Sequence, residues 1–181
     1  MKKLLSLVLA LVMVTGLLAG CGSKEPEQTA PAKPSVEGTM EELLNKVLEI
    51  QPVEFMGAAQ TLDLTKTDEE GLWAIKSTTG LEDASQITEA AVYEPMIGSI
   101  AYSMVMVRTA DGVDAKALGE SMKAGIDPRK WVCVAADQVL VAGYSDVVML
   151  IMLDSATGLT AQSFVDAFQQ VVGGTLDFTL A

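Results

Sequence analysis

The chain has 181 residues, of which 12 are basic and 24 are acidic, so its net charge at pH 7 is −12. A face that binds nucleic acid or anionic lipid headgroups needs clustered Lys and Arg, and the acidic excess argues against both ligands. No histidine is present, which excludes Ser-His-Asp and Cys-His catalysis and histidine-ligated zinc.

The N-terminus combines two lysines with an apolar run over residues 4–18 and the tetrapeptide Leu-Ala-Gly-Cys at 18–21. The run is shorter than the roughly 20 residues that a membrane-spanning helix needs. This layout is typical of an export signal, and its tetrapeptide resembles the lipobox of bacterial lipoproteins. The resemblance implies a signal peptide over 1–20 and a lipid on Cys21 that holds the protein on the extracytoplasmic face of the cell membrane. The alternatives are an ordinary signal peptide with an incidental cysteine and a cytoplasmic amphipathic start.

Cleavage of that signal would remove Lys2 and Lys3 and change the net charge to −14. Lipid rather than charge would then anchor the chain, because an acidic protein is not attracted to anionic headgroups. An acylated Cys21 would leave Cys133 without an intramolecular partner. Because Cys133 lies in an apolar run at 131–134, we expect a small buried side chain there rather than a reactive thiol.

The stretch from the lipidated cysteine to Gly38 (21–38) carries prolines, charged residues and few apolar side chains. Such a composition predicts a disordered linker, about 20–25 Å in root-mean-square length. The remaining residues, 39–181, are long enough for one extracytoplasmic domain with a single core.

The domain begins with a helix signal. Thr39-Met40-Glu41-Glu42 matches the S/T-x-x-E capping box, and apolar residues at helical spacing predict a helix over 40–50 that ends before Pro52. A second, shorter helix is predicted between the acidic residues at 68–70 and Gly80.

The pattern changes to strands from residue 87 onward. Predicted strands cover residues 91–94, 101–108, 131–135, 138–142 and 147–153. A helix over about 113–126 follows the second strand, and a last helix runs from its cap at Thr160 to Gly173.

At an offset of 46 residues Met106 aligns with Met152 and Gly112 with Gly158. The agreement reflects either a duplication or a common strand-turn-helix pattern. Both interpretations predict an α+β fold in which two β-β-α units form an antiparallel sheet of four to five strands. We expect the long helices mainly on one face, and the two N-terminal helices at the edge or end of the sheet.

Three positions are candidate binding sites. Arg129 and Lys130 stand beside Trp131, an arrangement that could grip a carboxylate or phosphate, although a helix-to-strand turn also uses such residues. Tyr93 and Tyr144 each lie with a carboxylate, of Glu94 and of Asp146, at an expected end of the sheet and could contact a sugar or peptide, although both could equally be loop termini.

Sequence signatures of cofactor chemistry are missing. The chain has no Walker loop, no dinucleotide-binding glycine pattern, no Gly-x-Ser-x-Gly elbow, no paired-cysteine motif and no calcium loop. We therefore expect neither a cofactor nor a metal. Paired carboxylates are the remaining route to catalysis, and no spacing distinguishes a pair.

Five features of the chain carry a further resemblance: the lipobox, the acidic spacer, the capped helix, Glu-Gly-Leu at 70–72, and Val-Met-Val-Arg at 105–108 before Asp111-Gly112. Together they resemble a family of small clostridial-type lipoproteins of unknown function. The likeness spans Met40 to Val172. It implies a Gram-positive envelope and brings no activity or catalytic residue.

We expect a non-enzymatic, membrane-anchored extracytoplasmic domain that binds a protein or another envelope component. The alternatives are a small-ligand-binding lipoprotein and a carboxylate-dependent cell-wall hydrolase. A close pair of acids in a deep cleft would favour the hydrolase. An apolar pocket lined by Tyr and Trp would favour the ligand binder, and an exposed apolar patch would favour the partner-binding domain.

Overall fold

A computed structural model describes residues 34–181. The expected signal peptide, the lipobox with Cys21, and residues 22–33 of the expected linker lie outside the described residues. Within residues 34–181 no helix is long and apolar enough to cross a membrane.

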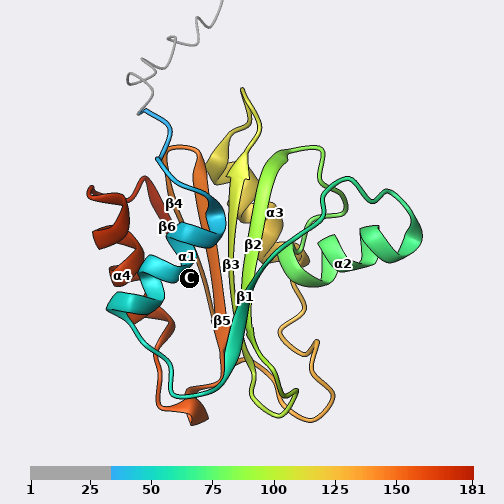
Figure 1. Cartoon of the computed structure of the whole chain (residues 1–181), viewed down its shortest axis with the longest axis vertical. Coiled ribbons are helices and arrows are strands. Elements are labelled where there is room, and N and C mark those ends of the chain that lie inside the picture. Colours follow the sequence, from blue (N-terminus) through green and yellow to red (C-terminus); the bar gives the residue numbers. More distant parts are fainter. Residues whose placement is uncertain (1–33) are drawn as a thin grey trace, which may run out of the picture. The chain divides into compact units, whose positions relative to one another are not determined.

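The centre of the domain is one antiparallel sheet of six strands in the order β1-β2-β3-β5-β4-β6 (Figure 1). The strands are β1 (Gly57–Thr61), β2 (Ile87–Pro95), β3 (Tyr102–Thr109), β4 (Gln138–Tyr144), β5 (Val147–Leu153) and β6 (Phe178–Leu180). β3 and β5 pair at the centre, where Tyr102 lies opposite Leu153 and Arg108 lies opposite Val147.

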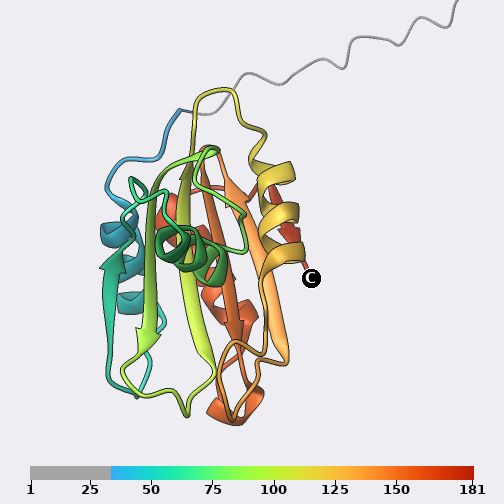
Figure 2. The same cartoon turned by 90° about the vertical axis from the view of Figure 1, so that its right-hand side faces the viewer.

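Helices cover both faces of the sheet (Figures 1 and 2). On what we call the first face lie α1 (Met40–Ile50) and α4 (Ala161–Val172), and on the second face lie α2 (Glu69–Thr79) and α3 (Ala115–Gly125). A single 3₁₀ turn, η1 (Ser155–Thr157), follows β5. The result is a three-layer arrangement, helix on sheet on helix.

Local signals set the helix ends. The Thr39 hydroxyl accepts a hydrogen bond from the Glu42 amide (3.1 Å), and the Glu42 carboxylate accepts one from the Thr39 amide (3.0 Å), which completes a capping box at α1. An N-cap of this kind typically contributes about 1 kcal/mol. At the C-terminal end of α2, Gly80 has φ +80°, a backbone conformation in which any residue with a side chain would be strained.

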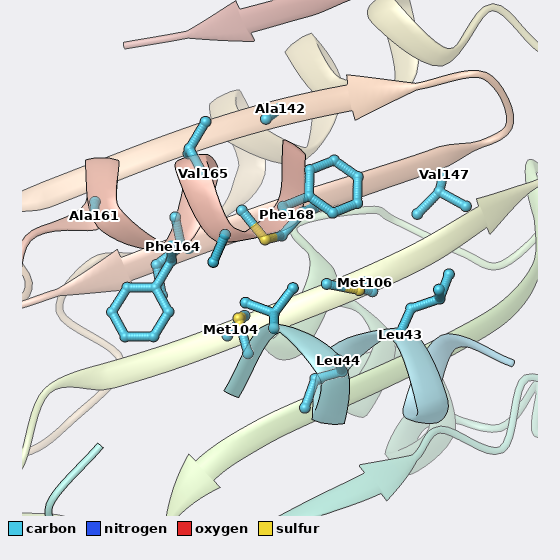
Figure 3. Close-up of a cluster of buried hydrophobic side chains, with 14 of the residues drawn as sticks. Leu43, Leu44, Met104, Met106, Ala142, Val147, Ala161, Phe164, Val165 and Phe168 are labelled. Carbon is cyan, nitrogen blue, oxygen red and sulfur yellow. The ribbon is translucent and has the colours of Figure 1, made fainter. Parts of the chain in front are cut away.

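Both faces of the central strands are buried, so the domain has two cores, one on each face, and not the single core expected from the sequence. Every residue of β5 is buried, which explains its uninterrupted apolar sequence. Figure 3 shows the first core, in which α1 contributes Leu43 and Leu44, α4 contributes Phe164 and Phe168, and β3 contributes Met104 and Met106. The second core packs Leu118 and Met122 of α3 and Ile75 of α2 against the opposite side chains of the same strands.

The expected strand count of four to five is wrong, because the sheet has six strands. The two unpredicted strands, β1 and β6, are its edges. β1 has the sequence Gly-Ala-Ala-Gln-Thr, without the large alternating side chains that signal a strand, and β6 has only three residues.

One expected strand does not form. Residues 131–135 lie in an irregular loop between α3 and β4, closed by a hydrogen bond from the Ala136 amide to the Pro128 carbonyl (2.8 Å). Cys133 is exposed in this loop, so the expectation of a buried cysteine is wrong as well. The run is apolar in sequence, but no neighbouring strand takes it into the sheet.

The expected placement of the helices is also wrong. The long helices α3 and α4 lie on opposite faces. The two N-terminal helices do not lie at the edge or end of the sheet, because α1 covers the first face and α2 covers the second. The physical reason is that β3 and β5 present apolar side chains on both sides. Each face needs its own helical cover.

This placement bears on the internal repeat. The chain does contain two consecutive β-β-α units, β2-β3-α3 and β4-β5-α4. Because β3 and β5 are antiparallel neighbours, the rotation that superposes one unit on the other is a two-fold rotation about an axis perpendicular to the sheet. Such a rotation does not exchange the two faces, so two equivalent units would carry both helices on the same face. They lie on opposite faces, and the aligned Met106 and Met152 likewise point to different cores. The units therefore have opposite hand, which favours a common pattern over a duplication.

Candidate functional site

The described chain begins at one end of the sheet, where residues 34–39 are held by a polar cluster around Arg108. Its guanidinium donates to Asp146, to the Ser35 hydroxyl (3.0 Å) and to the Gly38 carbonyl (2.7 Å). Asp146 in turn accepts hydrogen bonds from the Val36 amide (2.9 Å) and the Ser35 hydroxyl (2.5 Å). We call this the proximal end, since the expected linker leads into it.

Charge balance stabilises the proximal end. Glu89 accepts a hydrogen bond from the Met40 amide at the start of α1 (2.9 Å) and lies 3.5 Å from Arg108 Nε. Burial by itself would raise the pKa of Asp146, but the hydrogen bonds from Ser35 and Val36 and the Arg108 charge outweigh it and lower that pKa below its ordinary value. The entry of the chain into the domain is thus fixed to the sheet.

The Arg129-Lys130-Trp131 segment lies at the opposite, distal end. Lys130 Nζ donates to Glu94 Oε1 (2.5 Å) and to the Ser103 hydroxyl (3.2 Å), and it stands 5.4 Å from the centre of the Trp131 ring. Glu94 therefore balances the Lys130 charge, while Arg129 is exposed. The three candidate residues are adjacent, but Lys130 mainly ties its loop to β2 and β3.

The contact between Ser103 and Lys130 does not offer an accessible nucleophile. Ser103 is fully buried and donates a hydrogen bond to Glu94 (2.7 Å). A substrate could not reach its hydroxyl oxygen, and its place at the start of β3 makes it part of the polar anchor for the loop. Among residues 34–181, no group of three or more His, Cys, Asp or Glu side chains could hold a metal ion.

The two candidate tyrosines are not brought together. Both lie on the first face. Tyr93 pairs with Met104, which in turn pairs with Ile151 of β5, whereas Tyr144 pairs with Val147 of β5. Ile151 and Val147 are four residues apart on one strand, so the two tyrosines are separated by about 13 Å along the strand direction. Tyr93 packs against Phe55 with ring centres 6.3 Å apart. Each ring also fills the space beside a glycine, Gly57 for Tyr93 and Gly174 for Tyr144.

Sequence reasoning missed a group of exposed apolar side chains at the distal end. They are large, they lie in three separate loops, and most of their surface is in contact with solvent. We call this group the distal tip: Met56 (79% exposed), Met96 (71%), Ile97 (58%) and Val132 (100%).

These loops lie side by side. The Met96 amide donates to the Met56 carbonyl (3.0 Å), and Lys130 joins the loop of Val132 to Glu94 at the end of β2. The following strands β3 and β4 both start opposite Leu153, which places the preceding loops at one end of the sheet. A signal was present in the sequence: Met96 and Ile97 stand between Pro95 and Gly98, where a loop would normally be polar.

A cleft of about 260 Å³ lies on the second face, between α2 and the β1–β2 edge. Its lining mixes apolar, hydroxyl and charged groups and contains no tyrosine or tryptophan. The lining residues are Gln60, Thr61, Leu62, Asp63, Lys66, Glu70, Gly71, Ala74, Ile75, Thr78, Val92 and Glu94.

Compared with models of protein families, with curated proteins and with solved structures, the chain matches none of them. The likeness to clostridial-type lipoproteins stays a prediction from the sequence.

Proposed function

We propose that this protein is a lipid-anchored, extracytoplasmic domain that binds a partner protein in a bacterial cell envelope and catalyses no reaction. The lipobox-like tetrapeptide ending in Cys21 and the polar stretch 22–38 support the anchor and its spacer. The proximal cluster supports an orientation, because the linker enters the domain at the end opposite to the distal tip.

The distal tip is the observation that carries the proposal. Single exposed apolar residues are normal on a protein surface, but four large ones in neighbouring loops are typical of an interaction site. Covering such a side chain completely contributes about 1.5–3 kcal/mol. A partner that buries all four would therefore gain enough to offset much of the cost of association.

The two alternative functions have weaker support. The cleft beside α2 is smaller than the roughly 300–1,000 Å³ of typical small-molecule sites, and a larger hollow of about 590 Å³ at the end of α4 is lined by polar side chains and glycines instead of apolar ones. For a hydrolase, Glu94 is the carboxylate shared by the cleft and the distal loop, and it is already engaged by Lys130 and Ser103. Neither arrangement favours a ligand or a reaction as strongly as the tip favours a partner.

Site-specific photo-crosslinking in intact cells tests the proposal. A benzoylphenylalanine placed at Ile97 or Val132 should give a discrete protein adduct, whereas the same group at Glu120, an exposed position of α3, should not. Adding Met96→Asp should weaken the adduct. Absence of any adduct from the tip, or equal adducts from all three positions, would contradict the proposal.

A further inference from the structure

β1 leaves one edge of the sheet open. It is the first strand in the sheet order, so within residues 34–181 no strand pairs with its outer side. Figure 2 shows β1 as the outermost strand of the sheet on that side. Its start adjoins Met56 of the distal tip, so the open edge and the tip are continuous.

The backbone groups on that edge can be assigned from the ladder. The Leu62 amide donates to the Ala90 carbonyl (2.9 Å), and the Met56 carbonyl accepts from the Met96 amide. The even-numbered residues of β1 therefore bond inward to β2. Because inward and outward groups alternate along an antiparallel strand, the N–H and C=O groups of 57, 59 and 61 point outward.

β1 carries none of the features that usually protect an edge strand. Natural edges are blocked by lysine, proline, a bulge or a covering segment. β1 has no charged residue and no proline, and its five residues pair with β2 in unbroken register from Gly57 opposite Pro95 to Thr61 opposite Ala91. It is a regular template for one more strand.

The cleft lies directly beside this edge, on the second face. Gln60 and Thr61 of β1 belong to its lining, and the carboxylates of Asp63 and Glu70 outnumber the ammonium of Lys66 there. Side chains of an added strand would alternate between the two faces, so every second one would point toward the cleft. A basic side chain fits the charge of this space.

We infer that the edge of β1 binds an extended segment of the partner protein by strand addition, with a lysine or arginine side chain of that segment in the cleft. This inference rests on the proposed function and names the binding mode of the partner. Backbone hydrogen bonds would supply affinity, and the cleft would supply specificity. A second copy of this chain is a poorer occupant, because two molecules that each carry 24 acidic and at most 12 basic residues repel each other.

A peptide with alternating side chains tests the inference directly. We expect the fluorescein-labelled peptide TVKVKVT to bind the full chain in detergent and to slow amide hydrogen exchange at 57–61. The peptide TVEVEVT should bind at least fivefold more weakly. TVKPKVT, whose proline disrupts a strand, should bind at least tenfold more weakly. No binding of TVKVKVT, equal binding of the three peptides, or protection away from β1 would overturn the inference.

Two pairs of variants locate the contact. Ala59→Pro removes an outward N–H group without removing an inward bond, and it should weaken TVKVKVT binding at least tenfold, whereas Ala59→Ser keeps the N–H group and should not. Glu70→Lys should weaken that peptide and strengthen TVEVEVT, whereas Glu69→Lys, in the same helical turn but outside the cleft lining, should change neither. If Ala59→Pro misfolds, the Glu70 pair still decides, and equal effects of the two lysine substitutions would overturn the inference.

The experiments separate this inference from the proposed function. Tip crosslinks that persist in Ala59→Pro, together with unchanged peptide binding, would overturn strand addition and leave the partner-binding proposal standing. Peptide binding that follows the expected pattern without any tip crosslink would support the edge site and contradict the tip. Concentration-dependent dimers with protection at 57–61 would overturn the inference in favour of a second copy.

Discussion

Arg108 is the side chain that joins the start of the domain to its sheet. One guanidinium contacts Asp146 and Glu89 and also the backbone of the entering segment at Gly38. Such a fork of donors cannot be replaced by the single ammonium of a lysine. Because Arg108 contacts Asp146 and Gly38, which lie 38 and 70 positions away in the chain, these contacts stabilise the tertiary fold rather than one element.

Asp146 predicts a pH dependence at this site. Its pKa in the folded state lies below the ordinary 3.8, so its stabilising contribution is complete above about pH 3.8 and is lost as the pH falls through the lower folded-state value. Asp146→Asn should lower the free energy of unfolding by about 1–2 kcal/mol at pH 7. Urea unfolding at pH 7, 5 and 3 should show that the difference from wild type shrinks only at the lowest pH. A difference that is constant across this range would contradict the assignment.

At the scale of elements, the sequence predicts those features of a helix or strand that depend on residues close together in the chain. The α1 capping box joins Thr39 to Glu42, three residues away, and the pattern is visible without any knowledge of the fold. β1 is different, because its strand character comes from pairing with β2 and not from its own small side chains. Likewise, a strand such as β5 that is apolar on both faces does not indicate which face a later helix will cover.

The same distinction applies to the candidate site. The sequence draws attention to Lys130 and Trp131, and the structure places them at the distal end, but the partner of Lys130 is Glu94, 36 residues away. The tip itself joins loops from three parts of the chain. Only the sheet register brings Met56, Met96 and Val132 to one end.

The loop that carries Val132 depends on Lys130, which gives a prediction at this scale. Lys130→Met should leave Glu94 without its cation, lower the free energy of unfolding by about 1 kcal/mol and speed amide hydrogen exchange over 127–137. Arg129→Met is the matched control, because this neighbouring cation is exposed. Equal effects of the two substitutions would contradict an anchoring role for Lys130.

At the scale of the whole molecule, the two ends of the sheet have different chemistry. The proximal end is polar and receives the linker, and the distal end exposes apolar side chains. The expected linker of about 20–25 Å would leave the domain free to turn, so the polar clamp would matter because it holds residues 34–39 at the end away from the tip. The proposed function therefore depends on the lipid being attached where the sequence predicts it, which is a separate test.

Cys21 and Cys133 are the two cysteines of the chain, and each controls for the other. Cells grown with an alkyne-bearing fatty acid should incorporate it into wild-type protein and into Cys133→Ala, but not into Cys21→Ala, because the lipid is expected on the Cys21 thiol. Cys133 is exposed, so a membrane-impermeant maleimide added to intact cells should label wild type and fail to label Cys133→Ala. Fatty-acid label that persists in Cys21→Ala would contradict the anchor. Maleimide labelling that requires cell lysis would instead place the domain on the wrong side of the membrane for the partner proposed here.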